Sequence, residues 1–257
     1  MYKRQIAKYP VISSLSRSDS IRRRASSLAT NNVSSSFAFA IRSSTAFRRA
    51  SKSIAGKLGR TRDCAVAAEP FPPVLARLIG AVERRIRAQF PAADVPSGWH
   101  LNTCLINFYG RRRDGEAWVD VARVGDHRDF EPGPVASISL GARALFQFVR
   151  RGAVGGPPVR TQWLEDGSLQ AFGGAWWKDE LLHRVQRVED KAEPELPPSI
   201  NGFRSRRVNF TFRYVPDAHV VPYAALGAEA RADVEEYVAE LARASPFFRR
   251  ALDASSG

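Results

Sequence analysis

The pattern of apolar and polar positions between residues 101 and 214 predicts a series of short strands. Apolar residues there either follow one another or alternate with polar residues, and glycine or proline separates the segments. The predicted strands cover 101–109, 118–124, 135–140, 144–149, 159–164, 168–172, 183–188 and 206–214, with a basic turn at 111–115. Many short strands with regular turns are typical of barrels and sandwiches, so the pattern predicts a mainly β domain.

Helical spacing of apolar residues occurs on both sides of this strand region. Apolar positions 74, 75, 78, 79, 82 and 86 follow a helical period behind Pro73 and predict a helix over 74–86. The stretch 224–252 has similar spacing and predicts a helical tail that packs on the outside. We therefore divide the chain into a segment 1–62, a β domain 63–216 flanked by helices, and a helical extension 217–257.

The net charge of +13 is concentrated in the first quarter of the chain. Residues 1–62 hold 14 Lys and Arg against one acidic residue, Asp19, whereas residues 63–257 hold 25 basic and 25 acidic residues. This Ser- and Arg-rich segment buries too little apolar surface to offset its ordering entropy, so we expect it to be disordered.

Three interpretations of the segment 1–62 stay open, and the expected localisation depends on them. It has the character of an organelle transit peptide, of a basic arm that binds phosphates, or of sequence that is not native to the domain. A transit peptide predicts a mitochondrial or other organellar protein. If the segment is not native, we expect the protein in the cytoplasm or the nucleus.

Composition disfavours two further classes of protein. Cys64 and Cys104 form neither a disulfide framework nor a Cys/His spacing typical of zinc sites. No apolar run approaches the length of a membrane span, so we expect no membrane partner.

A His-x-Asp tripeptide lies shortly before the third predicted strand. On one face of a strand, His127 and Asp129 would offer an imidazole nitrogen and a carboxylate oxygen. These are two of the three ligands of the site that holds iron(II) with two histidines and one carboxylate. The third ligand would be one of the remaining histidines, His100, His183 or His219. The alternative is an exposed turn with a solvated carboxylate, because short motifs often occur by chance.

The last predicted strand carries two arginines on one of its faces. The strand period places a polar set together there, namely Arg207, Asn209, Thr211 and Arg213. Two guanidinium groups inside a barrel need an anionic partner, and a dicarboxylate would supply one carboxylate for each of them. The alternative is a solvated face whose arginines pair with surface acids.

At these motifs the chain resembles the AlkB-type iron(II)- and 2-oxoglutarate-dependent dioxygenases. The resemblance covers about 101–216 and implies a double-stranded β-helix, or jelly roll. It rests on 102–109, on His127-Arg128-Asp129-Phe130-Glu131, on 135–141, on 166–169, on His183 and on the Arg-x-Asn-x-Thr-x-Arg signature at 207–213.

The resemblance implies a role for each matching residue and three small-molecule partners. His127, Asp129 and His183 would ligate iron(II). The 2-oxoglutarate carboxylates would be held by Arg207 and Arg213, with Asn209, Asn107 and Tyr109 beside the same co-substrate. Glu131 matches an acidic position near the substrate base, and its alternative is a plain surface carboxylate. Molecular oxygen would be the third small-molecule partner.

The implied function is oxidative demethylation of N-alkylated bases in nucleic acid, of the DNA-repair type, by a monomer. The base would have to be single-stranded or flipped out of its stack. The family's aromatic lid has no counterpart at 57–73, so Trp118, Trp163, Trp176 and Trp177 are the candidates for stacking a base. The alternatives are a 2-oxoglutarate hydroxylase acting on RNA, protein or lipid, and an inactive nucleic-acid-binding module.

Overall fold

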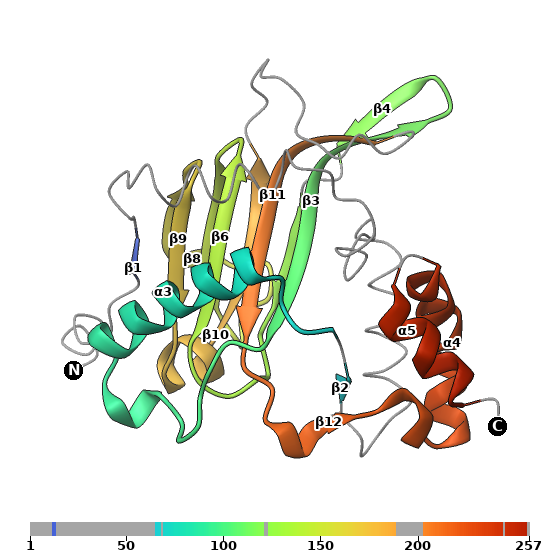
Figure 1. The fold of residues 1–257 in the computed structure, drawn as a ribbon. Coiled ribbons are helices and arrows are strands. Elements are labelled where there is room, and N and C mark those ends of the chain that lie inside the picture. The colour runs from blue at the N-terminus through green and yellow to red at the C-terminus, as the bar shows by residue number, and fades with distance from the viewer. Residues whose placement is uncertain are drawn as a thin grey trace.

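The computed structural model describes residues 12–13, 65–67, 69–120, 123–188, 203–243 and 245–255. Almost all of the basic segment 1–62 lies outside these residues, so its predicted disorder stays a prediction. Two antiparallel sheets form the body of the protein (Figure 1). This arrangement, with few helices, confirms the predicted mainly β jelly-roll class.

The larger sheet has six strands in the order β1-β9-β6-β11-β3-β4. Their bounds are β1 Ile12–Ser13, β3 Thr103–Asp114, β4 Ala117–Asp120, β6 Val135–Gly141, β9 Ser168–Phe172 and β11 Phe203–Arg213. The smaller sheet has the order β5-β10-β7-β8. Its strands are β5 Val124–His127, β7 Ala144–Arg150, β8 Pro158–Leu164 and β10 Leu181–Val188.

Helix α3, Pro73–Gln89, covers the outer face of the larger sheet (Figure 1). Proline at its start supplies a fixed φ where the backbone N–H would have no helical partner. Its buried side chains occupy the predicted apolar positions, Leu75, Leu78, Ile79, Val82 and Ile86. They share a core with Val208, Phe210 and Phe212 of β11, which confirms the predicted helix and extends it to Gln89.

The opposite face of the larger sheet turns toward the smaller sheet, and it is there that the polar side chains of β11 lie. A second core cluster joins the two sheets, with Tyr109 and Phe172 from the larger one and Phe146, Phe148 and Leu181 from the smaller one. Strand alternation therefore divides β11 as predicted, with one apolar face under α3 and one polar face between the sheets.

The predicted basic turn at 111–115 is wrong. Arg111 to Asp114 continue β3, which pairs with β4 from Asp114↔Ala117 to Arg111↔Asp120. Gly115, with a φ of 60°, starts the turn. The hairpin therefore forms an arm that extends past the sheet (Figure 1). The strand predicted over 118–124 is likewise divided into β4 and β5, with residues 121–122 outside the described ones.

The C-terminal residues form a separate helical unit beside the sheets (Figure 1). Helices α4, Ala228–Ala242, and α5, Pro246–Asp253, share a buried cluster that contains no residue of the two large sheets. The parallel pair β2, Ala65–Val66, and β12, Val220–Val221, lies on its connection to the domain. The predicted helical tail is present, whereas the domain boundaries stay predictions. None of the helices among the described residues is long and apolar enough to cross a membrane.

Candidate metal centre

Two histidines and one aspartate converge where β5 and β10 pair. His183 on β10 lies directly opposite His127, the last residue of β5. Asp129 follows two residues after His127, beyond the end of the strand. One ligand atom from each of the three side chains lies within 4.8 Å of the others. Among the described residues these three form the one group of this kind, and it is the predicted triad.

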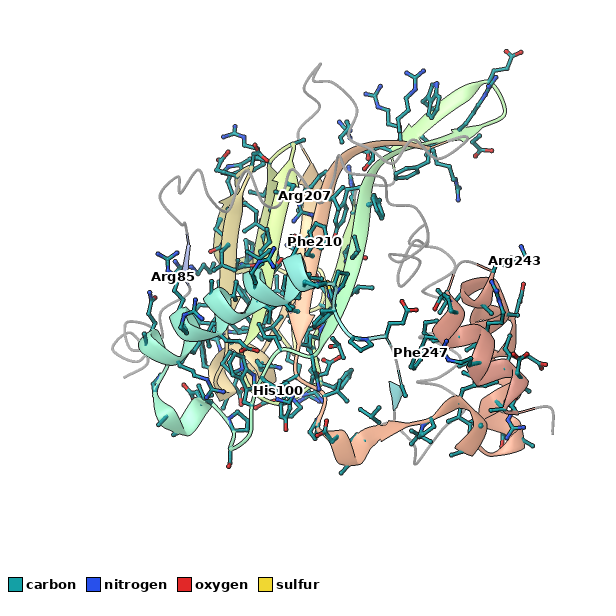
Figure 2. All side chains as sticks on the ribbon, viewed as in Figure 1. Arg85, His100, Arg207, Phe210, Arg243 and Phe247 are labelled. Atoms are coloured by element: carbon teal, nitrogen blue, oxygen red, sulfur yellow. The ribbon has the colours of Figure 1, made fainter. Side chains whose placement is uncertain are left out.

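The other histidines considered as the third ligand lie outside the group. The ring of His100 packs against Tyr214 with centroids 5.1 Å apart, and its Nδ1 lies 2.9 Å from the carbonyl oxygen of Gly98. Figure 2 shows His100 below the sheets, beyond the lower end of β11. His219 ends a short 3₁₀ helix, Asp217–His219, after that strand.

Both imidazoles of the triad are held in place by neighbouring groups. The Nδ1 of His127 lies 2.8 Å from the carbonyl oxygen of Gly125 and donates to it, which leaves Nε2 as the ring nitrogen for a metal. His183 is buried against the rings of Phe146 and Phe172, at centroid distances of 5.5 and 5.1 Å. Burial, with a smaller contribution from His127, lowers the pKa of His183 to about 3, so this imidazole is uncharged at neutral pH and one of its ring nitrogens has a lone pair for a metal.

Asp129 stays ionised although it is buried. Burial by itself would raise its pKa, but the positive charge of Arg213 holds the pKa of this carboxyl well below its usual range. Arg213 donates from Nε at 2.8 Å and from Nη2 at 2.5 Å, and both bonds go to Oδ1.

The second carboxylate oxygen of Asp129 is the atom that indicates a metal. Oδ2 is buried, has no hydrogen-bond partner and lies 3.5 Å from Nε2 of His183. A buried charged oxygen without a partner is costly unless a cation completes its environment. Two imidazoles with one carboxylate are the donor set that suits non-haem iron(II), so the residues present fit this ion.

Arg207 lies on β11 between the two sheets and is fully buried (Figure 2). Its Nε donates to Oγ of Ser139 at 2.7 Å, and its Nη2 donates to Oδ1 of Asn209 at 2.5 Å. The guanidinium carbon lies 4.5 Å from the ring centroid of Tyr109. Burial lowers the pKa of Arg207, but an arginine keeps its charge in proteins. Nη1 of Arg207 is buried and has no hydrogen-bond partner, so this nitrogen of the charged guanidinium can bind an anion.

The side chains around Arg207 continue this polar surface across the larger sheet. Asn107 on β3, Asn209 on β11, Ser139 on β6 and Ser168 on β9 stand opposite one another in one row. In the next row, Thr211, Ser137 and Gln170 are aligned in the same way. The hydroxyl of Ser168 and both amide atoms of Gln170 are buried without a partner. The Ser168 hydroxyl and the Gln170 amide nitrogen are unused donors, and they fit a carboxylate-bearing ligand.

Arg213, the second arginine of the dicarboxylate hypothesis, contacts two acidic side chains. Besides Asp129, its Nε lies 3.6 Å from Oε2 of Glu131, and these two acids raise the pKa of Arg213 against the effect of burial. Its contacts therefore balance charge at the metal ligand. A contact of Arg213 with 2-oxoglutarate stays a prediction.

A cavity of about 370 Å³ opens beside Asp129. Glu131 lines it, next to the metal ligand, which is compatible with its predicted place near a substrate. Its wall also contains Lys178, whose buried ammonium group donates to the backbone carbonyls of Glu131 and Gly133. Burial lowers the pKa of Lys178. Nothing in the sequence indicated that Lys178 would be buried beside the site, because a lysine between two tryptophans and two acids is typical of an exposed turn.

None of the four tryptophans considered for base stacking lines this cavity. Trp177 is buried against Phe148, with centroids 4.7 Å apart. Trp118, Trp163 and Trp176 each lie under an arginine, at 4.2, 4.5 and 5.6 Å from Arg204, Arg143 and Arg150 respectively. The residues 57–64, where a lid was sought, lie outside the described part of the chain.

Comparison with known proteins agrees with this donor set. The family described as "2OG-Fe(II) oxygenase superfamily" matches residues 18–213, and its match begins inside the basic segment. A solved structure described as "The structure of OsALKBH1" is similar to 56% of this chain at 25% sequence identity, with a TM-score of 0.38. The similarity spans 66% of that chain, just under two thirds of its length. No curated protein sequence matches this chain.

Proposed function

Because the chain belongs to the 2OG-Fe(II) oxygenase superfamily, which confirms the resemblance drawn from its motifs, we propose that it oxidatively demethylates N-alkylated bases in nucleic acid. The family implies iron(II), 2-oxoglutarate and oxygen as its cofactor and co-substrates. The observation that carries the proposal is the pair of unpartnered buried atoms, Oδ2 of Asp129 and Nη1 of Arg207. The Asp129 oxygen fits a metal cation, and the Arg207 nitrogen fits a carboxylate of 2-oxoglutarate.

His127, Asp129 and His183 would hold the iron. Bound there with 2-oxoglutarate and oxygen, the metal supplies the oxidation of a substrate C–H bond, here that of an N-methyl group. The chain keeps its ligands in place before any metal binds. Phe146 and Phe172 fix the ring of His183, the carbonyl of Gly125 fixes that of His127, and Arg213 fixes the Asp129 carboxylate.

Arg207 would bind the distal carboxylate of 2-oxoglutarate in a region closed to water. Ser139, Asn209 and the ring of Tyr109 hold its guanidinium in one orientation. Because the orientation of the Arg207 guanidinium is already fixed, little side-chain entropy is lost when a carboxylate binds to it. Asn107, which pairs in register with Asn209, borders the same space.

A nucleic-acid base is the substrate we propose, on the strength of the AlkB-type motifs and the cavity at Asp129. Methylation at N1 of adenine or N3 of cytosine gives a flat ring with a positive charge. Asp94 lines the cavity, and its buried Oδ2 has no hydrogen-bond partner, so this oxygen would favour a cation there. Glu131 and Asp179 line the cavity as well, each close to an arginine. Reaching it requires a base that is unstacked, so single-stranded or flipped substrates are expected.

The test uses the full chain with iron(II), ascorbate and 2-oxoglutarate. Single-stranded oligonucleotides that carry 1-methyladenine or 3-methylcytosine are incubated with it, and the product is read by intact mass and by succinate release. Loss of the methyl group, absent without 2-oxoglutarate and absent in His183→Ala, is the expected result.

Two other outcomes separate the alternatives. Succinate formed while every oligonucleotide stays intact would refute nucleic-acid demethylation and favour a hydroxylase with another substrate. No succinate under any of these conditions would refute the dioxygenase and favour the binding module.

A further inference from the structure

Phe130 is the residue next to a metal ligand, yet its side chain is 71% exposed. The other large hydrophobic side chains that are exposed among the described residues are valines, Val119, Val154 and Val159. Single exposed apolar residues are common on protein surfaces, so exposure alone says little. What distinguishes Phe130 is that it also lines the cavity beside Asp129.

The ring of Phe130 is supported on one side by a cation. The guanidinium carbon of Arg128 lies 4.6 Å from the ring centroid. Arg128 also lies near another residue of the cavity lining, because its Nη1 is 3.9 Å from Oδ1 of Asp179. A guanidinium stacked on an aromatic ring restrains that ring at a modest energetic gain. The ring is therefore held at the cavity, directly after the metal ligand in the chain.

We propose that Phe130, supported by Arg128, is the surface on which the flat ring of the substrate base stacks as it enters the cavity. This rests on the function proposed above and deepens it. Aromatic side chains at single-strand-binding sites stack bases in the same way, whatever the sequence, because every base has a π-face. The tryptophans considered for this task point elsewhere, which leaves Phe130 as the aromatic residue among those that line the cavity.

The edge of the base would meet a hydrogen-bond acceptor in the cavity lining. Asp94, from the short helix Ala92–Asp94, lines it, and its Oδ2 is buried without a partner. A ring that carries an amino group or a positive charge would supply the missing donor. The cavity lining thus combines one exposed aromatic ring, Phe130, with one unpartnered carboxylate oxygen, that of Asp94, and both would be used by a cationic methylated base.

The decisive variant is Phe130→Leu, which keeps apolar volume and removes the aromatic face. Its control is Val154→Ala, which changes an equally exposed residue in the β7–β8 turn, away from the cavity lining. Binding of a fluorescent single-stranded oligonucleotide with one 1-methyladenine is measured by anisotropy on the iron-free protein. We expect Phe130→Leu to weaken binding roughly 5- to 100-fold, the range that base–aromatic stacking gives. Val154→Ala and Phe130→Trp should bind within about 2-fold of the wild type or better.

Three further readouts distinguish stacking from a structural role. The loss in Phe130→Leu should be independent of salt, because no phosphate contact is removed. Its KM for the oligonucleotide should rise while kcat is kept. The circular dichroism spectrum and the Tm should equal those of the wild type, which shows that the fold is intact.

The failure of this inference differs from the failure of the proposed function. Equal affinity and KM in wild type and Phe130→Leu, with the methyl group still removed, would overturn the stacking role alone. A wild-type protein that forms succinate and neither binds nor changes any oligonucleotide would overturn the nucleic-acid substrate, and this proposal with it.

Discussion

Replacement of Arg213 by methionine tests whether the metal ligand depends on its arginine. In the protein, two N–H groups of Arg213 bind Oδ1 of Asp129, and the Asp129 side chain is 4% exposed. Methionine fills similar space and carries no charge, so the carboxylate would be left buried without its main counter-charge. Removing one partner of a buried pair costs about 3–5 kcal/mol, because the remaining charge is uncompensated.

The assay is thermal unfolding of the metal-free protein. For a domain of this size each kcal/mol corresponds to roughly 2–4 °C, so we expect the Tm to fall by about 6–20 °C. The control is Arg143→Met, which removes an exposed pair with Glu165 at 3.6 Å. Exposed pairs contribute at most about 1 kcal/mol, and its Tm should therefore change little.

Metal binding provides a second measurement in the same experiment. A redox-inert ion such as Mn²⁺ would provide the positive charge that the variant lacks, and it would use the free Oδ2 of Asp129. The Tm gained on adding saturating Mn²⁺ should therefore be larger in Arg213→Met than in the wild type. If Arg213→Met loses no more stability than Arg143→Met, or gains no more from the metal, the reasoning about charge balance at Asp129 is refuted.

Four other substitutions test separate parts of the site. His183→Ala should abolish iron-dependent succinate formation with an unchanged circular dichroism spectrum, and residual turnover would remove it from the centre. Arg207→Met should raise the KM for 2-oxoglutarate roughly 10- to 100-fold, as expected for a charged hydrogen bond, and an unchanged KM would contradict its role. Lys178→Met should cost about 1–3 kcal/mol in denaturant unfolding, since two carbonyls lose their donor; an unchanged midpoint would contradict this. Replacing Arg112 and Arg113 together by alanine should leave turnover of a methylated trinucleotide unchanged. The reason is distance, because β3 extends roughly 36 Å from Thr103, which pairs with Arg213, to the end of the arm. Reduced turnover would place the arm at the site.

Local periodicity was sufficient to predict most of the elements. The apolar spacing at 74–86 and the alternation along 207–213 depend only on which side of a helix or strand meets the core, and both predictions are confirmed. The basic turn failed for a related reason. Arg111 to Asp114 have no apolar alternation, yet their backbone pairs with β4, and a ladder of hydrogen bonds can extend a strand that no core requires.

The site shows the same division between local and distant information. The sequence by itself indicated the donor types and the polar face of β11, and the family motifs implied a triad, His127, Asp129 and His183, whose three side chains the structure brings together. From the residues alone, His100, His183 and His219 were equivalent candidates. Only the pairing of β10 with β5, between segments far apart in the chain, placed His183 opposite His127.

Tertiary structure also decided what each charged group contacts. Arg213 binds Asp129, Lys178 holds the carbonyls after it, and Phe130 stands exposed at the cavity. Side-chain partners across the fold depend on packing between segments, and burial decides whether a charge needs one. Sequence periodicity indicates on which side of a helix or strand a residue lies. It contains no information about which residue of another segment that side chain contacts.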